Sequence, residues 1–151
     1  MSRGWTYENF RVGQTFRSLE PVTVELEALK AFSAEFDPQP FHMDEEAAKT
    51  SFFGDLIASG WHTAAITMRL LATSNLKVEG GLIGVGVDEL KWPRPVKAGD
   101  TLTLELEVLA LRTLKSRDDR GLLTVQSTTR NQDGDPVLTM VVNMIVPRRS
   151  A

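Results

Sequence analysis

The chain has 151 residues, of which 42% are hydrophobic, and this size suits one domain, residues 1–151, whose core needs no disulfide to hold it. It contains no cysteine, which excludes disulfides, thiolate metal sites and cysteine nucleophiles and makes the cytoplasm the expected location. A net charge of −3, an N-terminus without a signal-peptide pattern and the lack of a membrane-length apolar run argue against nucleic-acid and membrane partners.

The first predicted helix runs from Thr23 to Phe36, with Thr23 as its expected N-cap. Apolar residues recur along it at helical spacing, at Leu26, Leu29, Phe32 and Phe36. Pro38 and Pro40 each restrict the preceding residue to an extended conformation. We therefore expect the helix to end near Asp37, in a stiff turn.

Two more helices are predicted before residue 75. Asp44 has the character of an N-cap for a short helix through Lys49. The segment from Gly60 to roughly Thr73 is apolar around nearly its whole circumference and carries Arg69 as its only charge. Such a helix is expected to be buried nearly all round.

The remaining elements are strands, because the hydrophobic pattern changes to period two. A turn at Asp133 and Gly134 is expected to join the last two of them. The predicted strands are Val12–Ser18, Leu82–Lys91, Thr101–Val108, Gly121–Arg130 and Val137–Val146. Long antiparallel strands after one buried helix predict an α+β fold, for which the hot-dog fold, a sheet wrapped around a central helix, is the candidate. Its open edge favours a homodimer or a higher homo-oligomer.

Asp37 and His42 are the candidate catalytic residues. A carboxylate and an imidazole five positions apart, in a proline-flanked turn, can share one water or substrate as an acid/base pair. The helix that begins at Gly60 offers unpaired backbone N–H groups to a developing oxyanion. Together these features indicate a site for acid/base chemistry.

The run FSAEFDPQPFHMDEEAAKTSFFGDLIASGWHT resembles the MaoC-like branch of hot-dog proteins, which includes (R)-specific enoyl-CoA hydratases and acyl-thioester dehydratases. The family signature is an Asp, four residues and a His, then an acidic helix start and a Gly that opens the central helix. Asp37, His42, Asp44 and Gly60 match it. The later KWPRPVKAGD resembles the strand end and turn that follow that helix in the family.

The resemblance implies a lyase that reversibly adds water to a trans-2-enoyl-CoA or related acyl-carrier thioester to give an (R)-3-hydroxyacyl thioester. In that role Asp37 would take a proton from water, His42 would hold the water, and the Gly60 N–H would polarise the thioester carbonyl. No metal or organic cofactor is implied. Ser59 and Trp61, on either side of Gly60, join it in the oxyanion and substrate-binding region. Trp61 is bulkier than the Met common in the family, which favours short or branched acyl chains.

Several residues and functions stay open. Arg94 is a candidate for contact with the phosphates of coenzyme A; the alternative is that it is a solvated cation at the end of a strand. His62 is a second candidate base or a helix residue that bonds to neighbouring loops, and Asp44 fits a simple cap. One alternative function is a hot-dog thioesterase, although residues 61–73 lack the carboxylate that such enzymes usually carry on the central helix. The other is a non-catalytic acyl-thioester-binding subunit.

Overall fold

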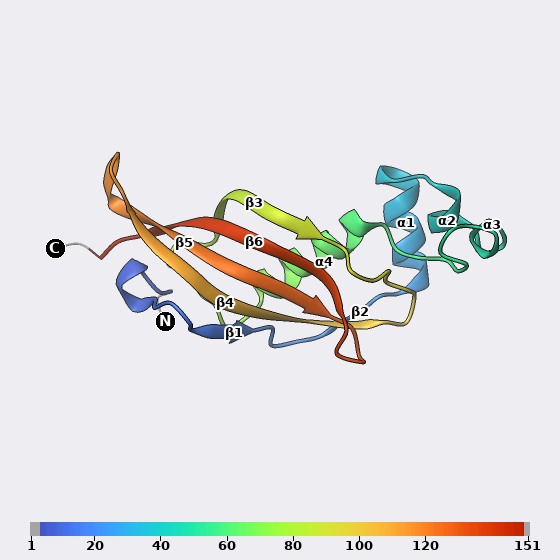
Figure 1. The fold of residues 1–151 in the computed structure, drawn as a ribbon, viewed down its shortest axis with the longest axis horizontal. Coiled ribbons are helices and arrows are strands. Elements are labelled where there is room, and N and C mark those ends of the chain that lie inside the picture. Colours follow the sequence, from blue (N-terminus) through green and yellow to red (C-terminus); the bar gives the residue numbers. More distant parts are fainter. Residues whose placement is uncertain (1–3, 150–151) are drawn as a thin grey trace.

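A twisted antiparallel sheet with one long helix along one of its faces makes up most of the molecule, with three shorter helices gathered at one end (Figure 1). The structure is a computed structural model and describes residues 4–149. Its helical elements are η1 (Tyr7–Asn9), α1 (Leu26–Phe36), α2 (Pro40–Met43), α3 (Glu45–Lys49) and α4 (Gly60–Ala72). Its strands are β1 (Thr15–Arg17), β2 (Val22–Thr23), β3 (Ile83–Lys91), β4 (Thr101–Leu114), β5 (Arg117–Arg130) and β6 (Pro136–Pro147). No helix of the described part is long and apolar enough to cross a membrane.

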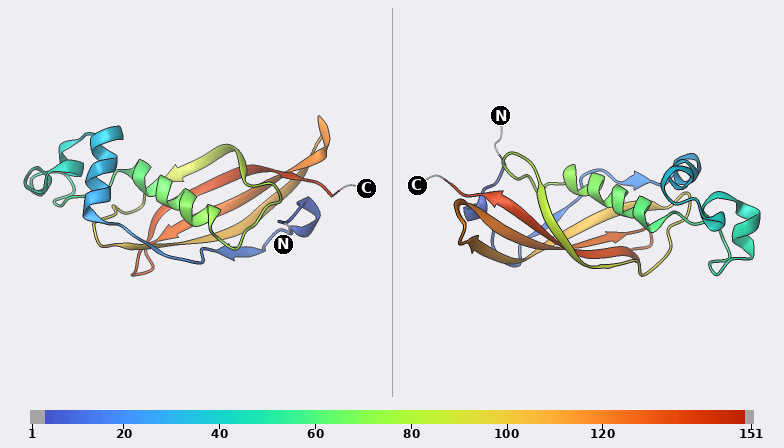
Figure 2. Two further views of the ribbon diagram at one scale, coloured as in Figure 1. Left: turned by 180° about the vertical axis from the view of Figure 1, so that it is seen from behind. Right: turned by 90° about the horizontal axis from the view of Figure 1, so that it is seen from above.

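The sheet has the strand order β1-β4-β5-β6-β3, and β2 pairs separately with β4. Every pair is antiparallel, and Val108, Val125 and Val142 lie side by side across three neighbouring strands. The turn between β5 and β6 is closed by the Gly134 N–H, which donates to the Asn131 carbonyl, with Gly134 at φ 82°. Figure 2 shows α4 running along one face of this sheet. The predicted α+β hot-dog architecture is confirmed.

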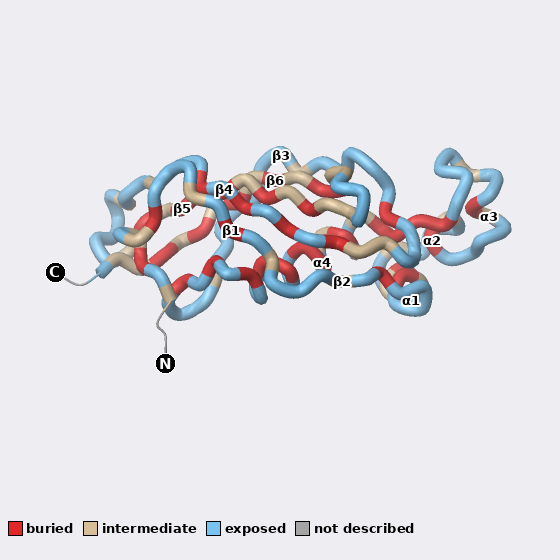
Figure 3. Tube along the Cα trace, turned by 90° about the horizontal axis from the view of Figure 1, so that it is seen from below, coloured by how far each residue is buried: buried red, intermediate tan, exposed pale blue. Residues whose placement is uncertain are grey.

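The core lies between α4 and the sheet. Alternate residues of β4 are buried, so the predicted period two appears as alternating colours along the strands in Figure 3. The inward-facing residues of β4 are Leu102, Leu104, Leu106 and Val108. They belong to one cluster with Leu70 and Leu71 of α4. This packing fixes the axis of α4 and therefore the position of its N-terminus.

The predicted start of α1 was wrong. Thr23 does not cap the helix but belongs to β2, where it pairs with Thr101 of β4. Glu25 occupies the N-cap position, and its side chain makes no capping hydrogen bond. Pairing with β4 keeps Thr23 extended, and this long-range contact overrides its local preference for a cap.

The strands also differ in length from the prediction. β4 and β5 continue beyond Val108 and before Gly121, because a bulge between Val108 and Ala110 interrupts the period-two pattern without ending the pairing. The N-terminal strand is shorter than Val12–Ser18, since only Thr15–Arg17 pairs with β4. The stiff turn after Asp37 contains the short helix α2.

The helix α4 is not buried all round, contrary to the prediction. Trp61 and Met68 are 58% and 47% exposed, and Ala65 and Ala72 on the same stripe are exposed too. The single sheet of one chain covers only one side of the helix. The apolar stripe is therefore left on the surface of the isolated chain.

Candidate active site

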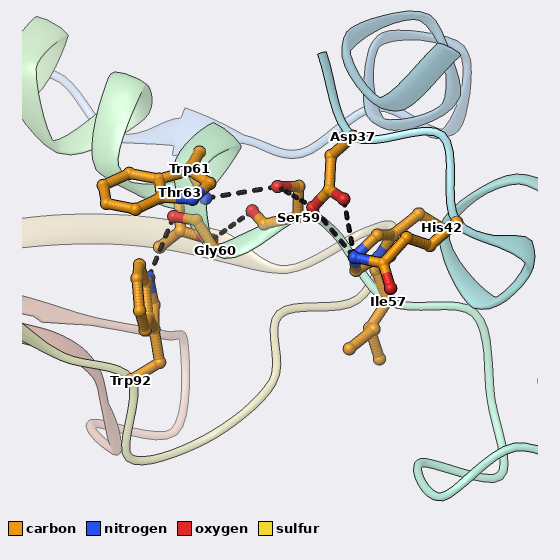
Figure 4. A network of polar contacts seen from close by, with 9 residues as sticks. Asp37, His42, Ile57, Ser59, Gly60, Trp61, Thr63 and Trp92 are labelled. Carbon is orange, nitrogen blue, oxygen red and sulfur yellow. Dashed lines mark hydrogen bonds and ion pairs between the residues drawn. The ribbon is translucent and has the colours of Figure 1, made fainter.

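The Asp37 carboxylate and the His42 imidazole lie together at the junction of α1 and α2. Asp37 is the C-cap of α1, and its N–H bonds to the Ser33 carbonyl. Pro40 occupies the first turn of α2, where a missing N–H costs nothing, and this short helix turns His42 back toward α1. The distance between His42 Nε2 and Asp37 Oδ2 is 3.2 Å. The predicted pair is thus brought together (Figure 4).

The other ring nitrogen of His42, Nδ1, orients the imidazole through a hydrogen bond. His42 Nδ1 is 2.8 Å from the Ile57 carbonyl oxygen, which can only accept, so Nδ1 carries a hydrogen. His42 Nε2 is thereby directed at the Asp37 carboxylate. His42 is 4% exposed, so water scarcely competes for this contact. The two side chains are thus placed so that both can act on one bound molecule.

Two neutral side chains complete the surroundings of the Asp37 carboxylate. Gln39 Nε2 donates to Oδ1 at 2.6 Å, and Ser59 Oγ donates to Oδ2 at 2.7 Å. Burial by itself would raise the pKa of Asp37, but the hydrogen bonds from Gln39 and Ser59 and the attraction of His42 outweigh it. The pKa of Asp37 is lowered, and the carboxylate is kept ionised at neutral pH.

The N-terminus of α4 lies beside this carboxylate. Ser59 is the N-cap, and its Oγ accepts a hydrogen bond from the Trp61 N–H at 3.2 Å. Within the described residues, the Gly60 N–H has no hydrogen-bond acceptor. It is one of the unpaired donors at the positive end of a 13-residue helix. This N–H is available to a negatively charged or polarised oxygen.

A cavity of about 570 Å³ joins these groups. Asp37, His42 and Gly60 all line it, as do two other predicted residues, Trp61 and Arg94. Ser59 does not: it is fully buried beneath the site and reaches the cavity only through Asp37 and the helix N-terminus. Much of the remaining wall is aromatic or aliphatic, namely Phe41, Phe52, Phe53, Ile57, Ala58, Trp92 and Val96. An acid/base pair and an unpaired N–H thus open into one largely apolar chamber.

Comparison with known proteins shows to which family this chain belongs. Residues 8–131 match the family model described as the MaoC like domain. The chain belongs to the MaoC-like domain family. Its fold is similar to a crystal structure of the MaoC-like dehydratase from Rhodospirillum rubrum, with 53% identity and a TM-score of 0.93 over 98% of this chain and 100% of that one.

Two solved (R)-hydratases are also similar to this MaoC-like chain. That of Pseudomonas aeruginosa, in the unliganded form, is 30% identical with a TM-score of 0.76, over 97% of this chain and 88% of the other. That of A. caviae, involved in PHA biosynthesis, is 29% identical with a TM-score of 0.74, over 93% and 99% of the two chains.

Other predicted site residues of this MaoC-like chain lie elsewhere. Asp44 caps α3, where its side chain accepts a hydrogen bond from the Glu46 N–H at 2.9 Å. His62 stacks on Phe32 of α1 with ring centroids 4.8 Å apart, and its buried Nδ1 has no partner in the described part of the chain. Burial lowers the pKa of His62 and favours its neutral form. His62 is absent from the cavity wall that holds Asp37.

The sequence did not single out Trp92 or the pair Phe52 and Phe53. Trp92 stands at the end of β3 and reaches Gly60, and Phe52, 96% exposed, lines the mouth of the cavity. The signal for Trp92 was a large aromatic residue beside a proline-rich turn. Only the fold shows that this turn lies against the N-terminus of α4.

Proposed function

We propose that the protein is an acyl-thioester hydratase, which reversibly adds water to a trans-2-enoyl thioester to give an (R)-3-hydroxyacyl thioester. The observation that carries the proposal is the shared cavity, into which the Asp37–His42 pair and the unpaired Gly60 N–H both open. Similarity to two (R)-hydratases supports the same reaction class.

In the proposed reaction Asp37 and His42 handle the proton of the attacking water. The pair takes a proton from the water as its oxygen bonds to C3 of the enoyl group. The π electrons move toward the thioester, and negative charge gathers on its carbonyl oxygen. The proton is then returned to C2, which restores the pair and balances the addition. Dehydration is the same sequence reversed.

The Gly60 N–H stabilises the charge that develops on the thioester oxygen. It needs no side-chain movement, because a helix N-terminus presents its donor in a fixed direction. The attraction grows as the oxygen becomes more negative, so the transition state gains more than the substrate does. The addition changes no oxidation state overall, and we propose no metal or organic cofactor.

The cavity supports a coenzyme A or acyl-carrier thioester as the substrate. Its aromatic and aliphatic wall suits an acyl group and the apolar parts of a pantetheine arm. The Arg94 side chain is 61% exposed. Its Nε lies 3.7 Å from Asp135 Oδ2, a long distance for an ion pair, so the guanidinium is available to a phosphate. Trp61 narrows the chamber, and we propose a preference for short or branched acyl chains.

We also propose that the protein acts as a homodimer. The exposed stripe of α4 includes Trp61 and Met68, and β3 lies at the edge of the sheet with apolar side chains in solvent on both faces. These are Ile83, Val85 and Val87, each about half exposed. A second copy would cover the stripe and the edge together. Sedimentation analysis should give twice the chain mass, and a monomer would contradict the proposal.

Thioester hydrolysis is the rival reaction. It is less well supported, because α4 contains no Asp or Glu, and the carboxylate of the site comes from the end of α1. The direct test is to incubate the protein with crotonyl-CoA and follow enoyl absorbance and free thiol together. Loss of absorbance without thiol, with an (R)-3-hydroxy product, is the expected result. Thiol release would indicate a thioesterase, and binding without either change would indicate a non-catalytic subunit.

A further inference from the structure

Trp92 makes two contacts with the residue that opens α4. Its indole N–H donates a hydrogen bond to the Gly60 carbonyl oxygen at 2.9 Å (Figure 4). Its ring also lies close against Gly60, where an added Cβ would come within 2.5 Å of Trp92 Cε2. The edge-to-face contact with Trp61, with centroids 5.2 Å apart, holds the indole from another side. Trp92 is thus fixed against one specific backbone unit.

The polar backbone groups around Gly60 are bonded on both sides. Before it, the Ser59 carbonyl accepts from the Thr63 N–H at 3.1 Å. After it, the Trp61 N–H bonds to Ser59 Oγ, and the Gly60 carbonyl is held by Trp92. The Gly60 N–H itself has no acceptor within residues 4–149. Ser59 at the N-cap thus holds the peptide that carries this donor, and Trp92, from outside the helix, holds the next peptide.

We infer that Trp92 is a positioning residue for the oxyanion donor, and this inference rests on the proposed hydratase function. A donor stabilises developing charge only if its direction is set before the reaction. The first turn of a helix is prone to fray, and Trp92 restrains it by a hydrogen bond from the end of β3. The indole also packs closely against Gly60, which limits movement of this residue.

This role predicts an effect on turnover more than on binding. The Gly60 N–H contact strengthens as charge develops, so a misaligned donor raises the barrier without greatly weakening the substrate complex. The substitution Trp92→Phe removes the indole N–H and keeps an aromatic ring. We expect kcat to fall about five- to tenfold, equivalent to one neutral hydrogen bond, with KM changed less than about twofold.

The matched control is Trp5→Phe. Trp5 packs on Phe10 and Phe16 in the N-terminal aromatic cluster and does not line the cavity. This variant makes the same chemical change at another site and should leave kcat unchanged. A structural role for Trp92 alone would lower stability without separating kcat from KM.

A spectroscopic readout tests the donor directly. A bound 2,4-dienoyl-CoA absorbs at longer wavelength when its carbonyl is polarised, so the red shift reports on the Gly60 N–H. We expect a red shift with the wild-type protein and with Trp5→Phe, and a smaller one with Trp92→Phe. Site-specific replacement of Trp92 by benzothienylalanine, which keeps the ring shape without the N–H, repeats the test should Trp92→Phe fold poorly.

The outcomes separate the inference from the function on which it rests. A wild-type protein that hydrates enoyl thioesters, with both Trp92 variants at wild-type kcat and red shift, would overturn the role of Trp92 alone. A wild-type protein that neither hydrates nor shifts the dienoyl spectrum would overturn both. A lower kcat and a smaller red shift in the Trp92 variants, with KM preserved, would support the role of Trp92 in positioning the Gly60 N–H.

Discussion

The hydroxyl of Ser59 lies 2.7 Å from Asp37 Oδ2 and also accepts the Trp61 N–H at 3.2 Å. One buried side chain therefore joins the carboxylate at the end of α1 to the N-terminus of α4. This link sets the separation between the Asp37–His42 pair and the Gly60 N–H, the groups that we propose carry the reaction. The relative placement of the two helices is thus part of the proposed chemistry.

Substitution Ser59→Ala should shift the pH dependence of activity. Ser59 is one of the donors that lower the pKa of Asp37, so its loss lets that pKa rise. The acid limb of the profile of kcat/KM should move to higher pH, because Asp37 loses its charge sooner as the pH falls. The lost cap should also destabilise the fold by about 1 kcal/mol. Ser59→Thr keeps a hydroxyl and serves as the control; an unmoved acid limb in Ser59→Ala would contradict the assignment.

Substitution Gly60→Ala should reduce both stability and activity. The new Cβ would lie 2.5 Å from Trp92 Cε2, so either the indole or the helix start must move. Such overpacking costs about 1 to 3 kcal/mol, measurable as a lower urea midpoint. The double variant Gly60→Ala with Trp92→Leu should regain part of the stability, because the smaller side chain leaves room. A wild-type midpoint in Gly60→Ala would show that the contact is not as described.

His62 should make the protein less stable in mild acid. Its pKa is lowered in the folded state by burial, so between that value and the unfolded value of about 6.5 the unfolded chain binds more protons. The free energy of unfolding should therefore fall as the pH drops below about 6.5. His62→Phe keeps the stacking on Phe32 and removes the titrating group. Urea titrations at pH 7 and pH 5 should show a smaller loss in the variant; equal losses would rule out this role for His62.

Substitution Trp61→Ala should widen the acyl preference. Trp61 lines the cavity beside Gly60, and its removal creates space where a longer chain can extend. With crotonyl to dodecenoyl thioesters, the wild-type protein should favour the short members, and Trp61→Ala should gain most on the long ones. A wild-type preference for the longest substrate would refute the size argument.

Sequence patterns predicted the helices and strands best where the structure depends on contacts between residues close in the chain. The alternation in β4 and the cap at Asp44 were read correctly, because each depends on neighbours within a few residues. Thr23 was misplaced because its strand pairing with Thr101 is a distant contact. The exposed stripe of α4 was missed because a run of apolar residues does not tell whether the chain itself covers it.

Part of the candidate active site was predictable because two of its residues lie close together in the chain. Asp37 and His42 lie close in the chain, and two prolines limit the ways the segment between them can fold. The role of Ser59 beneath Asp37 joins residues 22 positions apart, and that of Trp92 on Gly60 joins residues 32 apart. No periodicity or spacing rule connects such pairs. They become visible only when the helix and the sheet are placed together.

The Asp37–His42 pair is tested most directly by comparing hydration of crotonyl-CoA by the wild-type protein, Asp37→Asn, His42→Ala and the double variant. We predict that each single substitution lowers kcat/KM by about 10²- to 10⁴-fold, and that the double variant is little worse than either, because the two residues exchange one shared proton as a unit. Circular dichroism would confirm that all four proteins fold. Near-wild-type turnover in either single variant, or losses that multiply in the double variant, would show that Asp37 and His42 do not act together.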